Sequence, residues 1–138
     1  MAKKSKMIIC VVDDDPIFHY VCKVNLAALC KDLDFISFYD GKEALAYFME
    51  QNNAGNVLPN VLLVDINMPL MNGWELVDHL SNQQLLTNSK LYIVSSSVSP
   101  EDSFRSLSKK EVDSYLTKPL IRENFMQICW TDNHDDIP

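Results

Sequence analysis

Residues 61–73 read VLLVDINMPLMNG, and the first four form an unbroken apolar run that ends at Asp65. A short apolar run rich in β-branched residues is typical of a strand buried on both faces of a parallel sheet. The run Met7–Val12 has the same character and is followed by an aspartate, and Leu91–Val94 is followed by Ser95. The chain therefore contains several expected buried strands that each end on a polar residue.

Helical segments alternate with these strands. Asp15 supplies an N-cap and Pro16 a first-turn proline for a helix that extends to about Lys31. Further helices are expected from near Ala44, Trp74, Ser99 and Ile121, and further strands at Phe35–Tyr39 and Ser114–Thr117. The alternation predicts an α/β fold, a doubly wound five-stranded parallel sheet with helices on both faces, (βα)5.

Five side chains within the expected helices give expectations about packing. Phe104 and Leu107 have the spacing of an apolar helix face, so we expect them to point inward. His19 and His79 are expected to lie at the helix surface or its rim, as isolated histidines mostly do. Trp74 is expected to pack at the start of its helix.

The length and charge of the chain restrict its class of function. The 138-residue chain has 47% hydrophobic residues and a formal net charge of −7, with a pI near 4.8. It has the size of one domain, and an acidic chain has no general field that attracts nucleic acid or an anionic membrane. Direct binding to nucleic acid or to a membrane is therefore not expected.

The two ends of the chain differ in composition from its middle. Residues 1–6 form a basic extension with three lysines, and no apolar run near them reaches the length of a signal peptide or a membrane span. Residues 7–130 hold all the expected strands and helices, and residues 131–138 form a polar tail. We expect a single cytoplasmic domain between two short flanking segments.

The four cysteines, Cys10, Cys22, Cys30 and Cys129, lie in apolar segments and form no Cys-x-x-Cys pair. Free cysteine is among the most buried residue types, whereas metal sites and disulfide frameworks usually show characteristic spacings. We therefore expect all four cysteines to be reduced core residues without a functional role.

Polar residues gather at one edge of the expected sheet. In doubly wound folds, ligands bind beyond the carboxyl ends of the strands, where this chain places Asp13, Asp14, Asp65, Ser95 and Lys118. Carboxylates at short range repel one another, and a hard divalent cation with oxygen ligands neutralises them. The sequence thus predicts a Mg²⁺ site in which an aspartate attacks phosphorus, while the lysine and the serine stabilise charge on phosphoryl oxygens.

Four sequence blocks carry a resemblance to a known family. They are residues 8–15 (IICVVDDD), 62–73 (LLVDINMPLMNG), 93–97 (IVSSS) and 115–119 (YLTKP). In this order and at these spacings, over nearly the whole chain, the sequence resembles the receiver domains of response regulators, which have a flavodoxin-like fold. The resemblance implies a stand-alone phosphoacceptor of a bacterial two-component phosphorelay, a signalling switch and not an enzyme.

The resemblance also implies roles for single residues. Asp65 would accept a phosphoryl group from a sensor histidine kinase or a histidine phosphotransfer protein. Asp14, Asp65 and the Asn67 backbone carbonyl would bind Mg²⁺, with Asp13 assisting through water, and Lys118 would pair with the phosphoryl group. A downstream effector protein would bind the face that the switch changes.

The implied switch residues lie in the third and fourth blocks. Ser95 would be the switch hydroxyl, and Tyr115 the aromatic residue that turns inward as Ser95 moves toward the phosphoryl group. The run of three serines leaves the hydroxyl ambiguous by one residue, and we assign Ser95 because it directly follows the strand. Ser96 would offer its backbone N–H to the phosphoryl group, and Asn67 and Ser97 would occupy the two positions that tune dephosphorylation.

Two alternatives remain open at this point. A haloacid-dehalogenase-like Mg²⁺ phosphatase also forms an aspartyl phosphate, and residues 13–15 contain the Asp-x-Asp of that family. Against it, Ile17 stands where that family has Thr or Val, and only the tail could supply its acidic pair beyond Lys118. The second alternative is a receiver-like interaction module that acts without phosphorylation.

Overall fold

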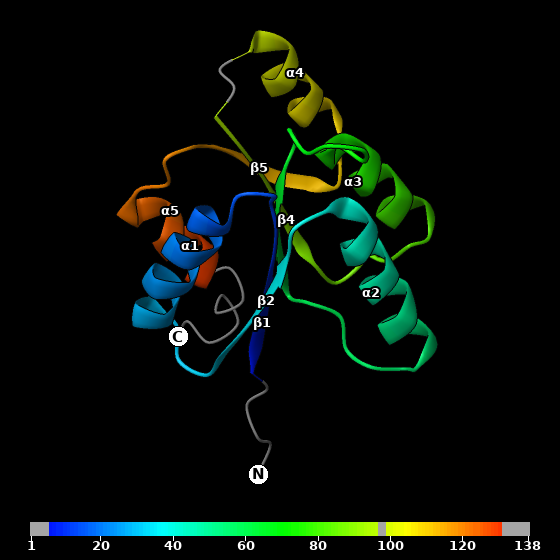
Figure 1. The fold of residues 1–138 in the computed structure, drawn as a ribbon, viewed down its shortest axis with the longest axis horizontal. Coiled ribbons are helices and arrows are strands. Elements are labelled where there is room, and N and C mark those ends of the chain that lie inside the picture. The colour runs from blue at the N-terminus through cyan, green and yellow to red at the C-terminus, as the bar shows by residue number, and fades with distance from the viewer. Residues whose placement is uncertain (1–5, 97–98, 131–138) are drawn as a thin grey trace.

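A computed structural model describes residues 6–96 and 99–130 of the chain. Within these residues, strands and helices alternate along the whole length (Figure 1). The strands are β1 (Met7–Val12), β2 (Leu33–Phe38), β3 (Val61–Asp65), β4 (Lys90–Ser95) and β5 (Val112–Thr117). The helices are α1 (Pro16–Leu29), α2 (Gly41–Asn53), α3 (Gly73–Asn82), α4 (Pro100–Ser108) and α5 (Arg122–Trp130).

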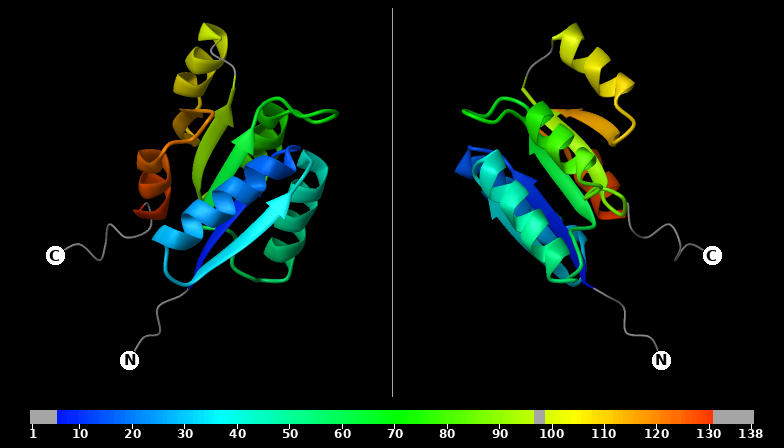
Figure 2. Two further views of the ribbon diagram at one scale, coloured as in Figure 1. Left: turned by 60° about the vertical axis from the view of Figure 1, so that its left-hand side comes forward. Right: turned by 90° about the vertical axis from the view of Figure 1, so that its right-hand side faces the viewer.

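The described strands form one parallel sheet with the order β2-β1-β3-β4-β5. Figures 1 and 2 show α1 and α5 on one face of the sheet and α2 and α3 on the other. The strand order reverses at β1 and β3, and doubly wound folds bind ligands beyond the carboxyl ends of the strands at such a switch point. The predicted flavodoxin-like fold is confirmed.

Each face of the sheet buries its own apolar cluster. Strand β3 is buried along its whole length because helices cover both of its faces. Phe18, Leu26 and Ile128 pack on the side of α1 and α5, and Phe48 and Leu80 on the side of α2 and α3. Burial of one such side chain contributes roughly 1.5–3 kcal/mol, so these two clusters hold the site-bearing strands in place.

Polar caps start the helices that follow the first four strands. Asp15, Asp40 and Ser99 each accept a hydrogen bond from a backbone N–H in the first turn of α1, α2 and α4, respectively. Asn72 and Glu75 form a capping box at the start of α3. Such a cap stabilises a helix by about 1 kcal/mol. Because each cap follows a strand, the caps also fix the loops at the carboxyl edge of the sheet.

The prediction that Phe104 and Leu107 point inward from α4 is wrong. Phe104 and Leu107 are 72% and 86% exposed, and Ser106 is the buried residue between them. Arg105 lies over the ring of Trp74, with its guanidinium carbon 5.1 Å from the ring centroid. The helix thus meets the protein through small and polar side chains, and helical spacing alone did not reveal which side faces inward. Trp74 is buried, as predicted.

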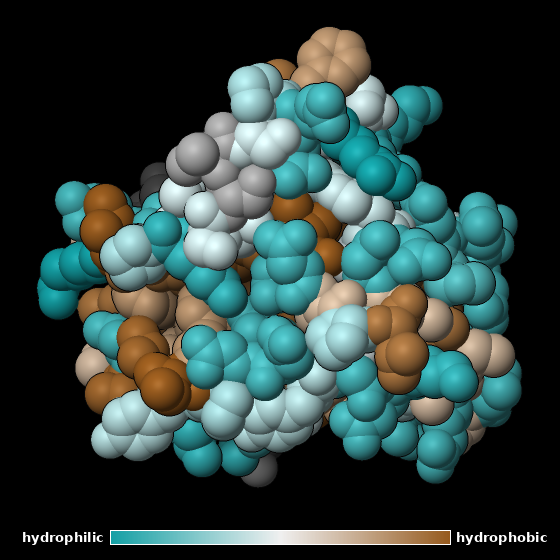
Figure 3. All heavy atoms as spheres, turned by 45° about the horizontal axis from the view of Figure 1, so that its top comes forward, coloured by the Kyte–Doolittle hydropathy of each residue, from teal (hydrophilic) through white to brown (hydrophobic). Residues whose placement is uncertain are grey.

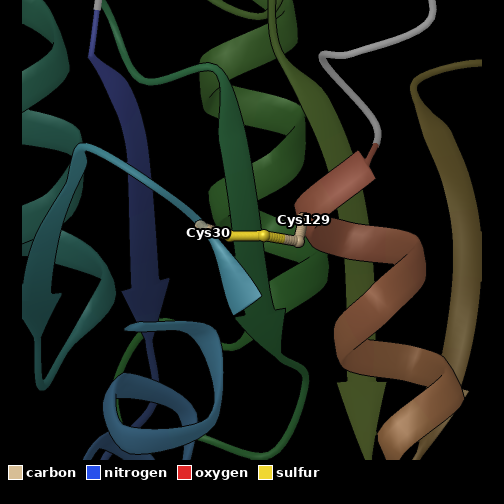
Figure 4. The surroundings of a disulfide bond; sticks show 2 residues. All are labelled: Cys30 and Cys129. Atoms are coloured by element: carbon tan, nitrogen blue, oxygen red, sulfur yellow. A yellow bond between two sulfur atoms is a disulfide. The ribbon is translucent and has the colours of Figure 1, made fainter. Parts of the chain in front are cut away.

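Cys30 and Cys129 are joined by a disulfide (Figure 4). Cys30 directly follows α1, and Cys129 lies in the last turn of α5, with Cα atoms 5.6 Å apart. The expectation of reduced cysteines is therefore wrong for this pair, whereas Cys10 and Cys22 are free and buried. Spacing along the chain gave no signal because the pair is 99 residues apart and meets only through the packing of α1 beside α5.

Some expectations fall outside the described residues. These are the first five residues of the basic extension, the polar tail at residues 131–138 and Ser97. Lys6, which belongs to the extension, is exposed and lies 3.5 Å from Asp34. In the described part of the chain, no helix has both the length and the apolar character that a membrane crossing requires.

Candidate functional site

Three aspartates meet at the carboxyl ends of β1 and β3. Asp13 and Asp14 follow β1, and Asp65 is the last residue of β3. One carboxylate oxygen from each residue lies within 4.8 Å of the others. Asp13 is fully buried and Asp65 is 6% exposed, whereas Asp14 is exposed to solvent. Carboxylate oxygens are the donors that hard divalent cations prefer, so this cluster fits a metal ion.

Lys118 enters the same cluster from the end of β5. Its Nζ lies 2.6 Å from Asp13 Oδ2 and 3.7 Å from Asp65 Oδ2. The ammonium also lies 4.4 Å from the ring centroid of Phe18, which shields it from solvent on one side. The Lys118 backbone N–H donates to the Ser95 carbonyl at 2.9 Å, and the peptide bond to Pro119 is cis. The predicted meeting of aspartates and lysine is thus present in the structure.

The charges around Asp65 oppose its ionisation. Burial raises the pKa of Asp65 to about 6, and the nearby charge of Asp13 adds to the increase. The Lys118 ammonium and a hydrogen bond from the Asn67 backbone N–H act in the opposite direction. A carboxylate with this pKa remains mainly ionised at neutral pH, and it is therefore available as a nucleophile or a metal ligand.

The chain after β3 closes tightly over Asp65. The Asn67 N–H donates to Asp65 Oδ1 at 3.2 Å, and the Gly73 N–H donates to the Ile66 carbonyl at 3.1 Å. A Cβ atom at Gly73 would lie 2.4 Å from the Asp65 carbonyl oxygen. Only glycine therefore permits α3 to begin this close to the end of β3.

Ser95 lies at the end of β4 and is fully buried. Its Oγ accepts a hydrogen bond from the Asn67 side-chain amide at 3.3 Å, so Ser95 and Asn67 meet beside Asp65. Burial raises the pKa of Tyr115, and a side-chain hydrogen bond with Ser95 partly offsets this rise. The structure thus brings Ser95, Asn67 and Tyr115 together, while the Ser96 side chain is exposed.

One buried residue near the cluster was missed by sequence analysis. His19 was expected at the helix surface, but it is only 3% exposed, and its Nε2 lies 2.7 Å from the Asp13 carbonyl oxygen. That expectation is wrong because His19, on the first turns of α1, lies over the loop after β1 instead of facing solvent. The sequence did offer one signal. His19 lies four residues after the Asp15 cap, where a helical side chain points back toward the loop before the helix. His79 is exposed, as predicted.

The geometry does not favour a phosphatase with Asp13 as nucleophile. Asp13 Oδ1 accepts the Asp15 N–H at 2.9 Å, and Oδ2 accepts Lys118 Nζ. Both oxygens are thus engaged inside a fully buried side chain. Asp15, the second residue of the Asp-x-Asp pattern, caps α1 through the Ile17 N–H. One Asp15 oxygen is thus committed to the cap of α1.

A doubly wound sheet with three carboxylates and a lysine at its switch point defines a class of α/β domain whose acidic cluster could hold a metal ion. The family model of the response regulator receiver domain matches residues 9–129. The chain therefore belongs to the receiver domain family, and it is a phosphoacceptor domain of two-component signalling. Proteins of this family are signalling domains that interact with histidine kinases and effectors.

Individual relatives agree with this assignment. The "Probable methanogenesis regulatory protein FilR2" of Methanothrix harundinacea (strain 6Ac) is 33% identical over 85 residues, which cover 62% of this chain and 54% of that protein. The crystal structure of a two-component response regulator from Cytophaga hutchinsonii has 27% identity and a TM-score of 0.79, covering 94% of this chain and 100% of that one. The matched region thus spans about half the length of FilR2.

A third similar structure is the Mn²⁺-bound form of response regulator Rcp1. It has 23% sequence identity and a TM-score of 0.73, and the match covers 93% of each chain. At this identity the likeness concerns the fold. The acidic cluster of the present chain offers three carboxylates to a metal by its own geometry.

Proposed function

We propose that Asp65 is the phosphoacceptor of this receiver domain. One of its carboxylate oxygens attacks the phosphorus of a phosphohistidine, the phosphorus–nitrogen bond breaks, and the leaving imidazole takes up a proton. The observation that carries this proposal is the position of Asp65, within 4.8 Å of two other carboxylates and 3.7 Å from the Lys118 ammonium. Asp13 also lies beside Lys118, but protein groups already engage both of its carboxylate oxygens.

The metal of this site is proposed to be Mg²⁺. Asp14, Asp65 and the Asn67 carbonyl would bind it directly, and Asp13 would act through water because protein groups already engage both of its carboxylate oxygens. Hard oxygen donors suit Mg²⁺, and Mn²⁺ in Rcp1 shows that a protein of this fold holds a divalent cation. When bound, Mg²⁺ would neutralise charge shared between carboxylate and phosphoryl oxygens.

The remaining side chains are proposed to stabilise the phosphoryl group and to report its presence. Lys118 would pair with a phosphoryl oxygen, the Ser95 hydroxyl would donate to another, and the Ser96 backbone N–H would approach a third. Ser95 would then leave the amide of Asn67, and Tyr115, which contacts Ser95, would follow it. A shift of this kind changes the face formed by α4, β5 and α5, to which a downstream effector protein would bind.

The rest of the domain takes supporting roles. Asn67 and Ser97 are proposed to tune dephosphorylation, with Ser97 outside the described residues. Residues 7–130 are proposed as the receiver domain, between the basic extension and the polar tail. The protein would assist only its own phosphorylation and dephosphorylation, and in this sense it would not be an enzyme.

The phosphodonor is proposed to be a sensor histidine kinase or a histidine phosphotransfer protein that docks on α1. Four apolar residues of this helix are exposed at positions i, i+3, i+4 and i+7: Ile17, Tyr20, Val21 and Val24. Figure 3 brings the carboxyl edge of the sheet forward and shows apolar patches within a mainly hydrophilic surface. Because α1 begins two residues after Asp14, a protein on this stripe would reach the acidic cluster.

The phosphoacceptor is tested by labelling the protein with acetyl phosphate and Mg²⁺ and measuring its intact mass. We expect the wild type to gain one phosphoryl group that hydroxylamine removes, and Asp65→Asn to gain none. Asp15→Asn, which keeps a capping side chain on α1, is the matched control and should be labelled. Full labelling of Asp65→Asn would refute the assignment, and an unlabelled wild type would favour an interaction module that acts without phosphorylation.

The docking stripe is tested with Tyr20→Ala. We expect slower phosphotransfer from a phosphorylated histidine kinase, while labelling by acetyl phosphate stays at the wild-type rate. Val57→Ala is the control, because Val57 is equally exposed but precedes β3, at the opposite edge of the sheet. An equal loss of rate with both phosphodonors would contradict a docking role for the stripe.

A further inference from the structure

His19 reaches back from α1 to the loop that carries the acidic pair. It lies in the first turns of α1, where side chains point toward the helix N-terminus. Its Nε2 is 2.7 Å from the backbone carbonyl oxygen of Asp13, and its ring lies 4.4 Å from the ring of Tyr39. His19 is thus held between the end of β1 and the residue that follows β2.

The contact defines which nitrogen of His19 carries a proton. A carbonyl oxygen only accepts hydrogen bonds, so Nε2 must be the donor. Nδ1 is buried and has no hydrogen-bond partner. A proton on Nε2 satisfies this contact, and His19 therefore acts as a donor to the Asp13 carbonyl.

With this bond, every polar atom of Asp13 is held. The Asp13 N–H donates to the Phe38 carbonyl at 3.1 Å, and the two carboxylate oxygens accept from the Asp15 N–H and from Lys118 Nζ. The carbonyl held by His19 belongs to the peptide group that joins Asp13 to Asp14. The orientation of that peptide group influences where the exposed Asp14 carboxylate points, and the Asp15 N–H bond to Asp13 Oδ1 holds the peptide group that follows.

We propose that His19 is a positioning residue for the cation site, acting by fixing the Asp13–Asp14 peptide group through its Nε2–H. The inference rests on the proposed function, because it assumes that Asp14 and Asp65 hold a divalent cation. Loss of a group that orients metal ligands typically weakens metal affinity by roughly 10–100-fold. His19 touches neither the cation nor the phosphoryl group, so its effect passes through the backbone.

Two substitutions separate the hydrogen bond from the packing of the ring. His19→Phe keeps an aromatic ring against Tyr39 but removes the donor. His19→Gln loses the ring, but its amide nitrogen reaches the place of Nε2 and restores the donor. Binding is measured with Mn²⁺, whose free form is counted by electron paramagnetic resonance, and urea unfolding without metal records the stability of each variant.

We expect His19→Phe to bind Mn²⁺ about tenfold more weakly than the wild type, and His19→Gln to stay within about twofold. His19→Met, apolar and of similar length, replaces the phenylalanine variant if that protein does not fold. Wild-type affinity in a folded donor-free variant, or equal weakening in the glutamine variant, would overturn this proposal alone. Absence of Mn²⁺ binding by the wild type would overturn the cation site of the proposed function and this proposal with it.

Discussion

The Lys118 ammonium forms an ion pair with Asp13, with 2.6 Å between Nζ and Asp13 Oδ2. The same Nζ lies 3.7 Å from Asp65 Oδ2. Asp13 is fully buried, so the lysine neutralises a carboxylate that solvent does not reach. Burial lowers the pKa of Lys118, but the hydrogen bond and charge of Asp13 outweigh it and raise the pKa overall. In this structure Lys118 therefore acts mainly as the counterion of Asp13, and it also lies close to Asp65.

Removal of this counterion should destabilise the protein. Lys118→Met keeps most of the apolar stem but leaves the Asp13 charge buried and unpaired, which costs about 3 kcal/mol in comparable cases. Urea unfolding at pH 7 without divalent cations measures the loss. The double variant Asp13→Asn with Lys118→Met is the control, and it should recover much of the stability because no buried charge remains. A loss below about 0.5 kcal/mol in the single variant would contradict the role of the Lys118 ammonium as the group that stabilises the buried Asp13 charge.

Asp65 should make the metal-free protein less stable as the pH rises. Its pKa is raised from 3.8 to about 6 on folding, mainly by burial, so the folded state keeps a proton that the unfolded chain releases between these values. The contribution of Asp65 to the free energy of unfolding is therefore full below pH 4 and falls as the pH rises to about 6, by on the order of 3 kcal/mol.

Asp65→Asn tests this pH dependence. In EDTA the variant should be more stable than the wild type at pH 7, and the difference should shrink toward pH 4. Added Mg²⁺ should stabilise the wild type more than the variant, because binding to the folded state alone adds to its stability. Parallel unfolding curves for the two proteins across this pH range would contradict a raised pKa at Asp65.

The sequence was informative where a local pattern of residues determines the structure directly. Apolar runs that end on polar residues predicted the strands, and their parallel arrangement brought Asp13, Asp65 and Lys118 to the same edge. Caps such as Asp15 predicted where helices begin. These features depend on neighbours in the chain or on a general rule of topology, so no knowledge of distant contacts was needed.

The errors arose where distant segments decide the outcome. The face of α4 turned inward was not evident from Phe104 and Leu107, because the partner surface selects that face. The burial of His19 depends on how α1 crosses the loop after β1. Cys30 and Cys129 meet only because α1 and α5 cover the same face of the sheet. In each case the local pattern was compatible with two arrangements, and tertiary packing chose between them.

The Cys30–Cys129 disulfide should contribute strongly to stability. It closes a loop with a sequence separation of 99 residues, and a cross-link of this span restricts the unfolded chain by roughly 4 kcal/mol. Urea unfolding with and without dithiothreitol measures the difference. The variant with alanine at both positions should show no effect of the reductant. This control shows whether dithiothreitol acts through the disulfide or by changing the solvent.

A thiol count provides an independent check of this bond. In denaturant without reductant, the protein should expose two thiols, from Cys10 and Cys22. After reduction it should expose four, the number of cysteines in the chain. Four thiols before reduction would show that the pair is reduced in the purified protein, and no stabilisation by the bond would then be expected.

The close approach of Gly73 to Asp65 should make this glycine far less replaceable than Gly41. Both are the first residues of helices that follow capped loops. A Cβ atom at Gly73 would lie 2.4 Å from the Asp65 carbonyl oxygen, a backbone atom, whereas one at Gly41 would first meet the Met71 sulfur at 3.0 Å. A methionine side chain can move aside, but the end of β3 cannot move without displacing Asp65.

We therefore expect Gly73→Ala to lower the free energy of unfolding by about 1–3 kcal/mol, the usual cost of overpacking, and to weaken Mn²⁺ binding as Asp65 shifts. Gly41→Ala should change stability by less than about 1 kcal/mol and leave Mn²⁺ binding intact. Urea unfolding and Mn²⁺ titration of the two variants measure both effects. If Gly73→Ala retained wild-type stability and affinity, the start of α3 would have room to move away, and its contact with β3 would not fix the position of Asp65.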